Sequence, residues 1–221
     1  MIIEIINQAL VAHNFSKVHE NDNTSFYVRE SGTAIRFAVL HRLDELMKPS
    51  DLNAIINQSA PESFLTDPAF KKNCDLICIH HLNKLAEFKN HEEQIFEIEE
   101  DPHFYKKYVL YYSDTEVEAI KGLNFEEINE LISDKSQFNI YKNEPTAPTK
   151  YSAAAKIFIK LPFLQLNIKK IELVPLRRQI EEAVAEIDLA KTYITIQKLG
   201  QTNVEELIKE LISDELANLP N

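Results

Sequence analysis

Hydrophobic residues recur at two different spacings in the first half of the chain, and each spacing predicts one kind of element. Apolar residues in the first eleven positions recur every three or four residues, which predicts a core-facing helix. Ser25–Glu30 and Thr33–His41 alternate apolar and polar residues around Gly32, which predicts a hairpin. Asp75–Leu82 is mostly apolar and predicts a buried strand, and the aromatic segment Tyr105–Tyr112 predicts another.

The segments between these strands read mainly as helices. Helical spacing or helix-start signals predict helices at Pro49–Gln58, Leu85–Glu93, Asp114–Leu123 and Phe125–Asp134. Gln94–Glu100 precedes a proline and is interpreted as a short strand. These elements together predict an α+β fold in which the N-terminal domain contains a mixed sheet.

The pattern changes after residue 134. Residues 135–150 hold two prolines and many small polar residues without periodicity, which indicates a linker or exposed loop. Later segments predict a mostly helical C-terminal region, with helices at Ser152–Leu161, Pro175–Ile194 and Asn203–Leu216 and an extended stretch at Phe163–Ile168 or Lys170–Val174. We therefore expect an α+β domain over residues 1–134, a connection over 135–150 and a helical region over 151–221.

The composition excludes several function classes. The chain has only three glycines, Gly32, Gly122 and Gly200, and they are far apart, so no glycine-rich loop can cradle a nucleotide phosphate. We expect no cofactor. No apolar run approaches the roughly 18 residues of a membrane span, and the N-terminus has no basic leader, so we expect a cytoplasmic protein. Cys74 and Cys78 are too far apart in an extended strand to form a disulfide and are expected in the core.

Basic residues concentrate in one segment of an otherwise acidic chain. The chain has a net charge of -11, yet Lys150–Arg178 contains seven basic residues against the single acid Glu172. Such a segment is a candidate anion-binding face, and the candidate residues are Lys156, Lys160, Lys169, Lys170, Arg177 and Arg178. Its partner could be DNA, an acidic protein surface or the acids of the chain itself.

Two groups of residues contain side chains that can bind metal ions. His80 and His81 are adjacent in a predicted strand, so they point to opposite faces and cannot easily bind one zinc ion, although Cys78 and His80 share a face. Glu97, Glu99, Glu100 and Asp101 lie near Lys106 and Lys107, but their order differs from the acid and acid-x-Lys arrangement of a metal-dependent nuclease. We therefore expect no catalytic, cofactor or metal site.

The stretch Ile95–Tyr112, IFEIEEDPHFYKKYVLYY, is the most distinctive of the chain, with four acids that lead into a proline and, after the proline, five aromatic residues around a lysine pair. Aromatic residues in such a setting favour core or interface packing. The candidate partner-binding residues are Glu99, Glu100, Asp101, Phe104, Lys107 and Tyr108. The stretch resembles the EEDP-aromatic-KKYVL segment of the middle components of ABC-three-component systems, the bacterial defence operons that include the Lamassu type.

The resemblance implies a function. It implies a non-catalytic adaptor that bridges an SMC/Rad50-like ATPase dimer and an effector, commonly a nuclease, in anti-phage or anti-plasmid defence, with DNA as a further partner within the complex. Two alternatives remain open from the residues alone. One is a metal-dependent nuclease-like enzyme that uses Glu99 or Lys107, and the other is a free-standing nucleic-acid-binding regulator that acts through Lys150–Arg178.

Overall fold

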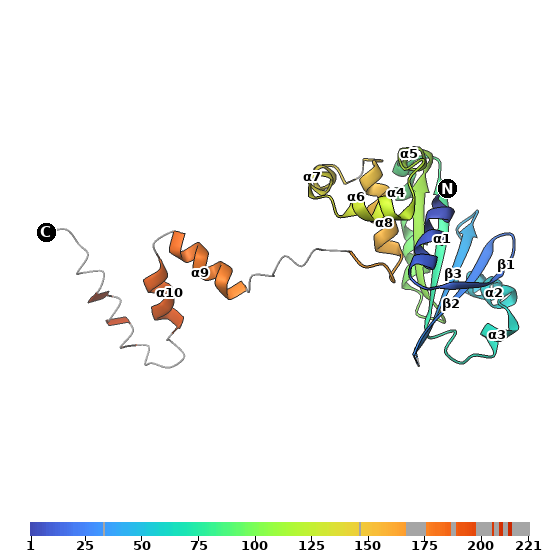
Figure 1. Cartoon of the computed structure of the whole chain (residues 1–221), viewed down its shortest axis with the longest axis horizontal. Helices are drawn as coiled ribbons and strands as arrows, with labels where there is room; N and C mark the ends of the chain where they lie inside the picture. Colours follow the sequence, from blue (N-terminus) through green and yellow to red (C-terminus); the bar gives the residue numbers. More distant parts are fainter. Residues whose placement is uncertain are drawn as a thin grey trace. The chain divides into compact units, whose positions relative to one another are not determined.

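A computed structural model describes residues 1–32, 34–145, 147–166, 176–186 and 189–197, together with residues 205, 208–209 and 212–213 (Figure 1). The chain divides into two units, Met1–Ile168 and Lys169–Asn221. The first unit holds the sheet, and the described residues of the second unit are mainly helical. This arrangement confirms the predicted α+β class, with a mixed sheet in the N-terminal part and helices after it.

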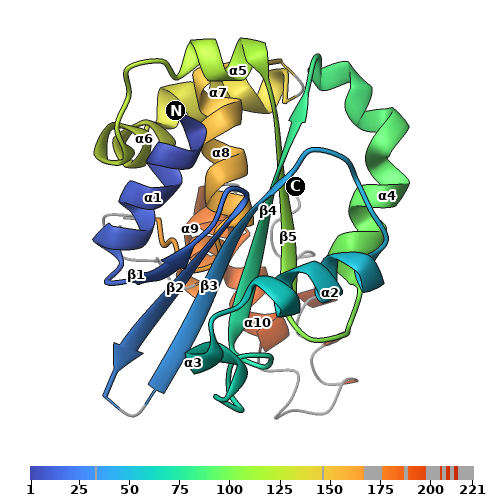
Figure 2. The ribbon, with the colours of Figure 1, turned by 90° about the vertical axis from the view of Figure 1, so that its right-hand side faces the viewer.

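The sheet has five strands in the order β1-β2-β3-β4-β5 (Figure 2). The first three strands pair antiparallel, whereas β3, β4 and β5 pair parallel. Their bounds are β1 (Ser16–Glu20), β2 (Thr24–Ser31), β3 (Ala34–Leu43), β4 (Cys74–Leu82) and β5 (Lys106–Ser113). The sheet therefore ends in two edges, one at β1 and the other at β5.

Both parallel connections cross the same face of the sheet. The chain passes from β3 to β4 through α2 (Pro49–Ser59) and α3 (Glu62–Leu65), and from β4 to β5 through η1 (Leu85–Glu87) and α4 (Phe88–Glu100). Such crossovers are nearly always right-handed, and both step in the same direction along the sheet, so α2 and α4 lie on one face. The opposite face is covered by α1 (Ile2–Ala12), α6 (Phe125–Ile132) and α8 (Lys150–Lys160) (Figure 2).

β4 is buried from both sides because it has a strand on each flank and a helical layer over each face. Leu76 and Cys78 belong to the core under α2 and α4, while Ile77 and Ile79 belong to the core under α1, α6 and α8. A strand covered on both faces reads as a nearly continuous apolar run, which is why the sequence predicts it well. Cys74 and Cys78 are both buried and free, as expected.

The predicted hairpin is confirmed as β2 and β3. Gly32 sits in its turn with φ 60°, a left-handed conformation that glycine adopts without strain. The register pairs Glu30 with Ile35 and places Arg29 directly opposite Arg36. This hairpin thus brings two cations to neighbouring positions on one face of the sheet.

β1 was not predicted. All five of its residues are exposed, so the strand has no alternation of apolar and polar positions to identify it. Its pairing with β2 shifts register between Lys17 and His19, as at a β-bulge.

The prediction of a strand at Gln94–Glu100 is wrong, because α4 continues to Glu100. Ile95 and Ile98 are its buried residues, and a separation of three places them on one face of a helix. The helix ends immediately before Pro102, since the residue that precedes a proline avoids the helical region.

Residues 135–150 differ from the predicted linker. They form α7 (Lys135–Asn143) and lead directly into α8, which packs inside the first unit. The Asp134 carboxylate accepts the backbone N–H groups of Ser136 and Gln137 and so caps α7, although no residue of α7 is buried. The boundary between the units falls after Ile168 rather than within 135–150.

The described part of the second unit contains α9 (Leu176–Glu186) and α10 (Ala190–Gln197). The single helix predicted over Pro175–Ile194 is therefore two helices. Most of the predicted helix Asn203–Leu216, and the extended alternative Lys170–Val174, lie outside the described residues. Among the described helices, none combines the length and apolar character needed to span a bilayer.

Candidate functional site

The loop between α4 and β5 is closed by an ion pair between Asp101 and Lys107. The Lys107 ammonium lies 2.8 Å from the Asp101 carboxylate, and the Lys107 side chain is fully buried. Lys107 also donates to the backbone carbonyls of His103 and Tyr105. Asp101 accepts further hydrogen bonds from His103 and Asn53. The pair therefore fixes the path of the loop that leads into the edge strand.

Electrostatics at Asp101 favour its charged form. Desolvation by burial alone would raise the pKa of Asp101. Hydrogen bonds from Lys107, His103 and Asn53 outweigh that effect and hold the pKa of this carboxyl well below its ordinary value. Asp101 therefore stabilises the loop between α4 and β5 in its charged, carboxylate form.

Glu99 joins three elements at the β5 edge of the sheet. Its carboxylate accepts the backbone N–H of Val109 at 2.7 Å and the ammonium of Lys160 at 2.5 Å. Val109 lies on the edge strand, and among the described residues no strand pairs with its outward side. A side chain of α4 therefore satisfies an edge donor of β5, and Lys160 ties α8 to the same point.

A second pair of this kind lies one turn earlier on α8. Glu116, fully buried on α5 (Asp114–Ala119), accepts hydrogen bonds from Lys156 at 2.5 Å and from Ser152 at 3.0 Å. Desolvation lowers the pKa of Lys156, and the Glu116 carboxylate opposes that shift. Lys156 also lies over the ring of Tyr111 at 4.7 Å from its centroid.

These contacts correct the prediction of an anion-binding face at Lys156 and Lys160. Their ammonium groups are largely buried against acids of the chain itself, which was one of the open alternatives. Arg177 and Arg178 each pair with a glutamate one turn later on α9, Glu181 and Glu182, across the helix surface. Lys169 and Lys170 lie outside the described residues.

The six candidate partner-binding residues therefore fall into two groups. The structure places Glu99, Asp101 and Lys107 in internal contacts. Glu100 and Phe104 are exposed, and Tyr108 is half-buried. Phe104 is unusual because its backbone has φ 64°, a left-handed conformation that a bulky residue rarely adopts, and its ring stacks under the ammonium of Lys71.

His80 and His81, the two histidines considered as zinc ligands, contact different groups. His80 is buried with its Nδ1 3.0 Å from the carbonyl oxygen of Leu43, and the exposed side chain of His81 contacts Asp114 near the C-terminal end of β4. Within the described ranges, no three side chains of His, Cys, Asp or Glu gather as a metal site would require.

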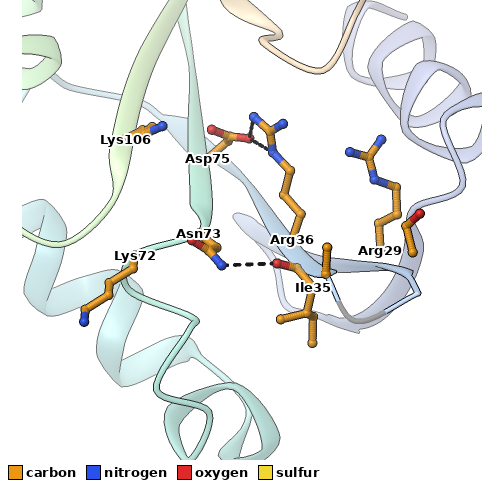
Figure 3. Close-up of a pocket in the computed structure, with 9 residues that line it drawn as sticks. Arg29, Ile35, Arg36, Lys72, Asn73, Asp75 and Lys106 are labelled. Atoms are coloured by element: carbon orange, nitrogen blue, oxygen red, sulfur yellow. Dashed lines mark hydrogen bonds and ion pairs between the residues drawn. The ribbon is translucent and has the colours of Figure 1, made fainter.

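A cluster of cations that the sequence did not predict lies at the N-terminal ends of β4 and β5. A cavity of about 380 Å³ is lined there by residues that include Arg29, Arg36, Lys72 and Lys106, with the acid Asp75 among them (Figure 3). These residues come from separate segments, so no run of charge in the sequence marks them. The available signal was the predicted hairpin, whose register around Gly32 sets Arg29 opposite Arg36.

Part of the chain matches the model of a known protein family. Residues 36–136 match the family model described as ABC-three component (ABC-3C) system Middle Component 1. Neither the curated proteins nor the solved structures gave a match. The matched segment begins in β3, ends at the start of α7 and contains the whole stretch Ile95–Tyr112. This match covers a little under half of the chain and confirms the resemblance to the middle components of ABC-three-component systems over residues 36–136.

Proposed function

We propose that this chain is a non-catalytic adaptor that bridges an SMC/Rad50-like ATPase dimer and an effector, commonly a nuclease, in anti-phage or anti-plasmid defence of the Lamassu type. DNA is a further partner of the assembled complex in this proposal. A bridging subunit needs two attachment surfaces that do not interfere with one another. The division of the chain into two units supplies a basis for that arrangement.

The observation that carries the proposal is the apolar surface of the second unit. Its described residues include large hydrophobic side chains that are substantially exposed, namely Ile180, Leu189, Ile194, Ile208 and Ile212. A short helical segment that leaves such side chains in water gains little from its own packing. Contact with a partner would bury this surface and stabilise the helices.

The first unit supports an adaptor over a nuclease. A metal-dependent nuclease needs acids that are free to bind Mg²⁺ and a lysine that is free to polarise water. Here Glu99 accepts from Val109 and Lys160, and Lys107 is buried against Asp101. These groups stabilise the fold, whereas Phe104 is presented on the surface beside them.

The ion pairs of α8 argue against a free-standing nucleic-acid-binding regulator. It required Lys156 and Lys160 to face a phosphate backbone, but both are paired with Glu116 and Glu99. With a net charge of -11, the isolated chain would also repel a polyanion at long range.

The proposal is tested by co-expression of the full chain with the ATPase and the effector encoded beside it, followed by size-exclusion chromatography. The double variant Ile180→Ser/Ile194→Ser should lose one partner and keep the other, because each serine removes exposed apolar area from the second unit. The variant Phe104→Ser should affect the partner that the first variant retains. The matched control Glu186→Ser/Thr192→Ser changes exposed polar positions of the same two helices and should retain both partners.

Two outcomes would contradict the adaptor proposal. One is a complex in which the ATPase and the effector still associate when this chain is omitted. The other is full retention of both partners by a chain that carries all three substitutions, Phe104→Ser, Ile180→Ser and Ile194→Ser.

A further inference from the structure

The cation-lined cavity at the ends of β2, β3, β4 and β5 has a charge balance opposite to that of the chain as a whole. Arg29, Arg36, Lys72 and Lys106 line it, and Asp75 is the acid among its lining residues (Figure 3). The chain as a whole is strongly acidic, so four cations and one carboxylate among the lining residues of one cavity are a local reversal of sign. We call these five residues and the space between them the cationic cavity.

The register of β2 and β3 places two of the cations, Arg29 and Arg36, at paired positions. Arg29 lies directly opposite Arg36 in the β2–β3 pair, and like charges in that position destabilise a sheet. Asp75 lies opposite Lys106 in the β4–β5 pair, on the same face. The excess of positive charge among these residues would favour an anion placed between them.

The single acid is already engaged. Asp75 is almost fully buried and lies 2.6 Å from the guanidinium of Arg36, to which it is joined by a second contact from Nε at 2.8 Å. Desolvation by burial raises the pKa of Asp75, and Arg36 opposes that shift. Because Asp75 has one carboxylate, it neutralises at most one of the four cations. Asp75 therefore holds Arg36 in position rather than cancelling the field of the cavity.

Arg29 is held in place by other groups. Its guanidinium donates to the backbone carbonyl of His13 at 3.3 Å and lies 4.8 Å from the centroid of the Phe15 ring. A guanidinium fixed by a carbonyl and a ring keeps its remaining N–H groups in a constant direction. Such pre-organisation lowers the entropy cost of binding an oxyanion.

A second cavity of about 320 Å³ shares Arg29 and Arg36 with the first. Its other walls include His13, Phe125 and Phe163, and the His13 ring contacts each of the two phenylalanine rings edge to face. The two cavities thus offer a cationic space and an aromatic space on either side of the same two arginines.

We infer that the cationic cavity binds the phosphate group of a small phosphate ester, with the remainder of the ligand directed toward His13 and Phe163. Guanidinium groups bind phosphate oxygens through paired hydrogen bonds, and Lys106 adds an exposed ammonium. The volume lies within the range of small-ligand sites. This inference goes beyond the adaptor function and does not depend on it.

The test is isothermal titration of the full chain with inorganic phosphate and with adenosine monophosphate at constant ionic strength. Saturable binding of at least one probe is expected. Arg29→Gln and Lys106→Gln should each weaken it about tenfold, the effect of losing one charged hydrogen bond. Lys142→Gln removes an exposed cation outside both cavities and should leave affinity unchanged.

Asp75→Asn gives the sharpest readout. Removal of its negative charge frees Arg36 and should strengthen phosphate binding severalfold, although the variant loses an ion pair and is less stable. A residue with only a structural role would weaken binding or leave it unchanged. Circular dichroism of each variant confirms that the chain is folded at the temperature of the titration.

Tighter binding of adenosine monophosphate than of phosphate supports use of the aromatic space, and equal binding supports recognition of the phosphate alone. The inference is overturned if neither probe saturates up to about 10 mM, the limit of weak binding. It is also overturned if Lys142→Gln weakens binding as much as Lys106→Gln. Binding of duplex DNA that depends on Arg29 and Lys106, without binding of either probe, would overturn it in favour of a nucleic-acid surface.

Discussion

The ammonium of Lys160 lies 2.5 Å from the carboxylate of Glu99, although 61 residues of sequence separate them. Glu99 is at the end of α4 and Lys160 is at the end of α8, so this contact fixes a helix from each face of the sheet to the same edge strand. The pair is more than a surface ion pair, because both side chains are mostly buried.

We expect Lys160→Met to lower the free energy of unfolding by about 1.5–3 kcal/mol, the range for a hydrogen bond to a charged group. Methionine keeps the aliphatic stem, so the loss reports the charge. Urea unfolding measures it. Lys121→Met breaks an exposed pair with Glu118 and should be nearly neutral. Equal effects of the two variants would show that the Glu99 contact adds no stability.

The Asp101–Lys107 pair predicts a specific acid sensitivity. The folded pKa of Asp101 is depressed, so its contribution is complete above the ordinary value of 3.8 and is lost as pH falls through the folded value. We expect the urea midpoint of the chain to fall below pH 4 more steeply than that of Asp101→Asn. Parallel pH profiles for the two proteins would contradict this assignment. Glu118→Gln, at an exposed pair, serves as the control.

Replacement of Phe104 is expected to stabilise the chain and to weaken the binding of a partner. Its left-handed backbone costs roughly 1 kcal/mol relative to glycine. Phe104→Gly should therefore raise the thermal midpoint while it weakens assembly with one partner. Phe96→Gly, at an exposed position inside α4, should lower the midpoint instead. A lower midpoint for Phe104→Gly would show that the ring contributes more than the strain costs.

Both thiols are expected to be inert in the folded chain. Burial raises the pKa of Cys78 to about 12 and raises that of Cys74 well above its ordinary value. Ellman's reagent should titrate no thiol at pH 8 in buffer and two thiols in urea. Rapid reaction of either cysteine in buffer would place it outside the core.

The purified full chain should hydrolyse neither ATP nor DNA. Its glycines are too dispersed for a phosphate-binding loop, and Glu99 and Lys107 are engaged in the fold. Assays with Mg²⁺ and Mn²⁺ measure both activities. Turnover that disappears in Glu99→Gln but persists in Glu118→Gln would assign catalysis to this site.

Sequence patterns predicted the elements whose burial is periodic and missed those fixed by contacts between distant segments. The apolar run around Ile77 and the alternation around Gly32 reported β4 and the hairpin correctly. The sequence did not predict β1, because none of its side chains is buried. The helix predicted in place of α4 ended too early, because the acids after Ile95 resembled the end of a strand. The pairing of Lys156 with Glu116 and of Lys160 with Glu99 depends on where α8 packs, which no local spacing reveals.

The two edges of the sheet limit how another chain can attach. At β5 a carboxylate of α4 already occupies an outward N–H group, and at β1 a bulge and the charged pair of Lys17 and Glu20 interrupt the line of free backbone groups. Extension of the sheet by a foreign strand is therefore disfavoured at both ends, and so is fibre-like self-association during high-level expression. A subunit that docks on this unit must recognise side chains, so its affinity can be changed by surface substitutions without disturbing the sheet.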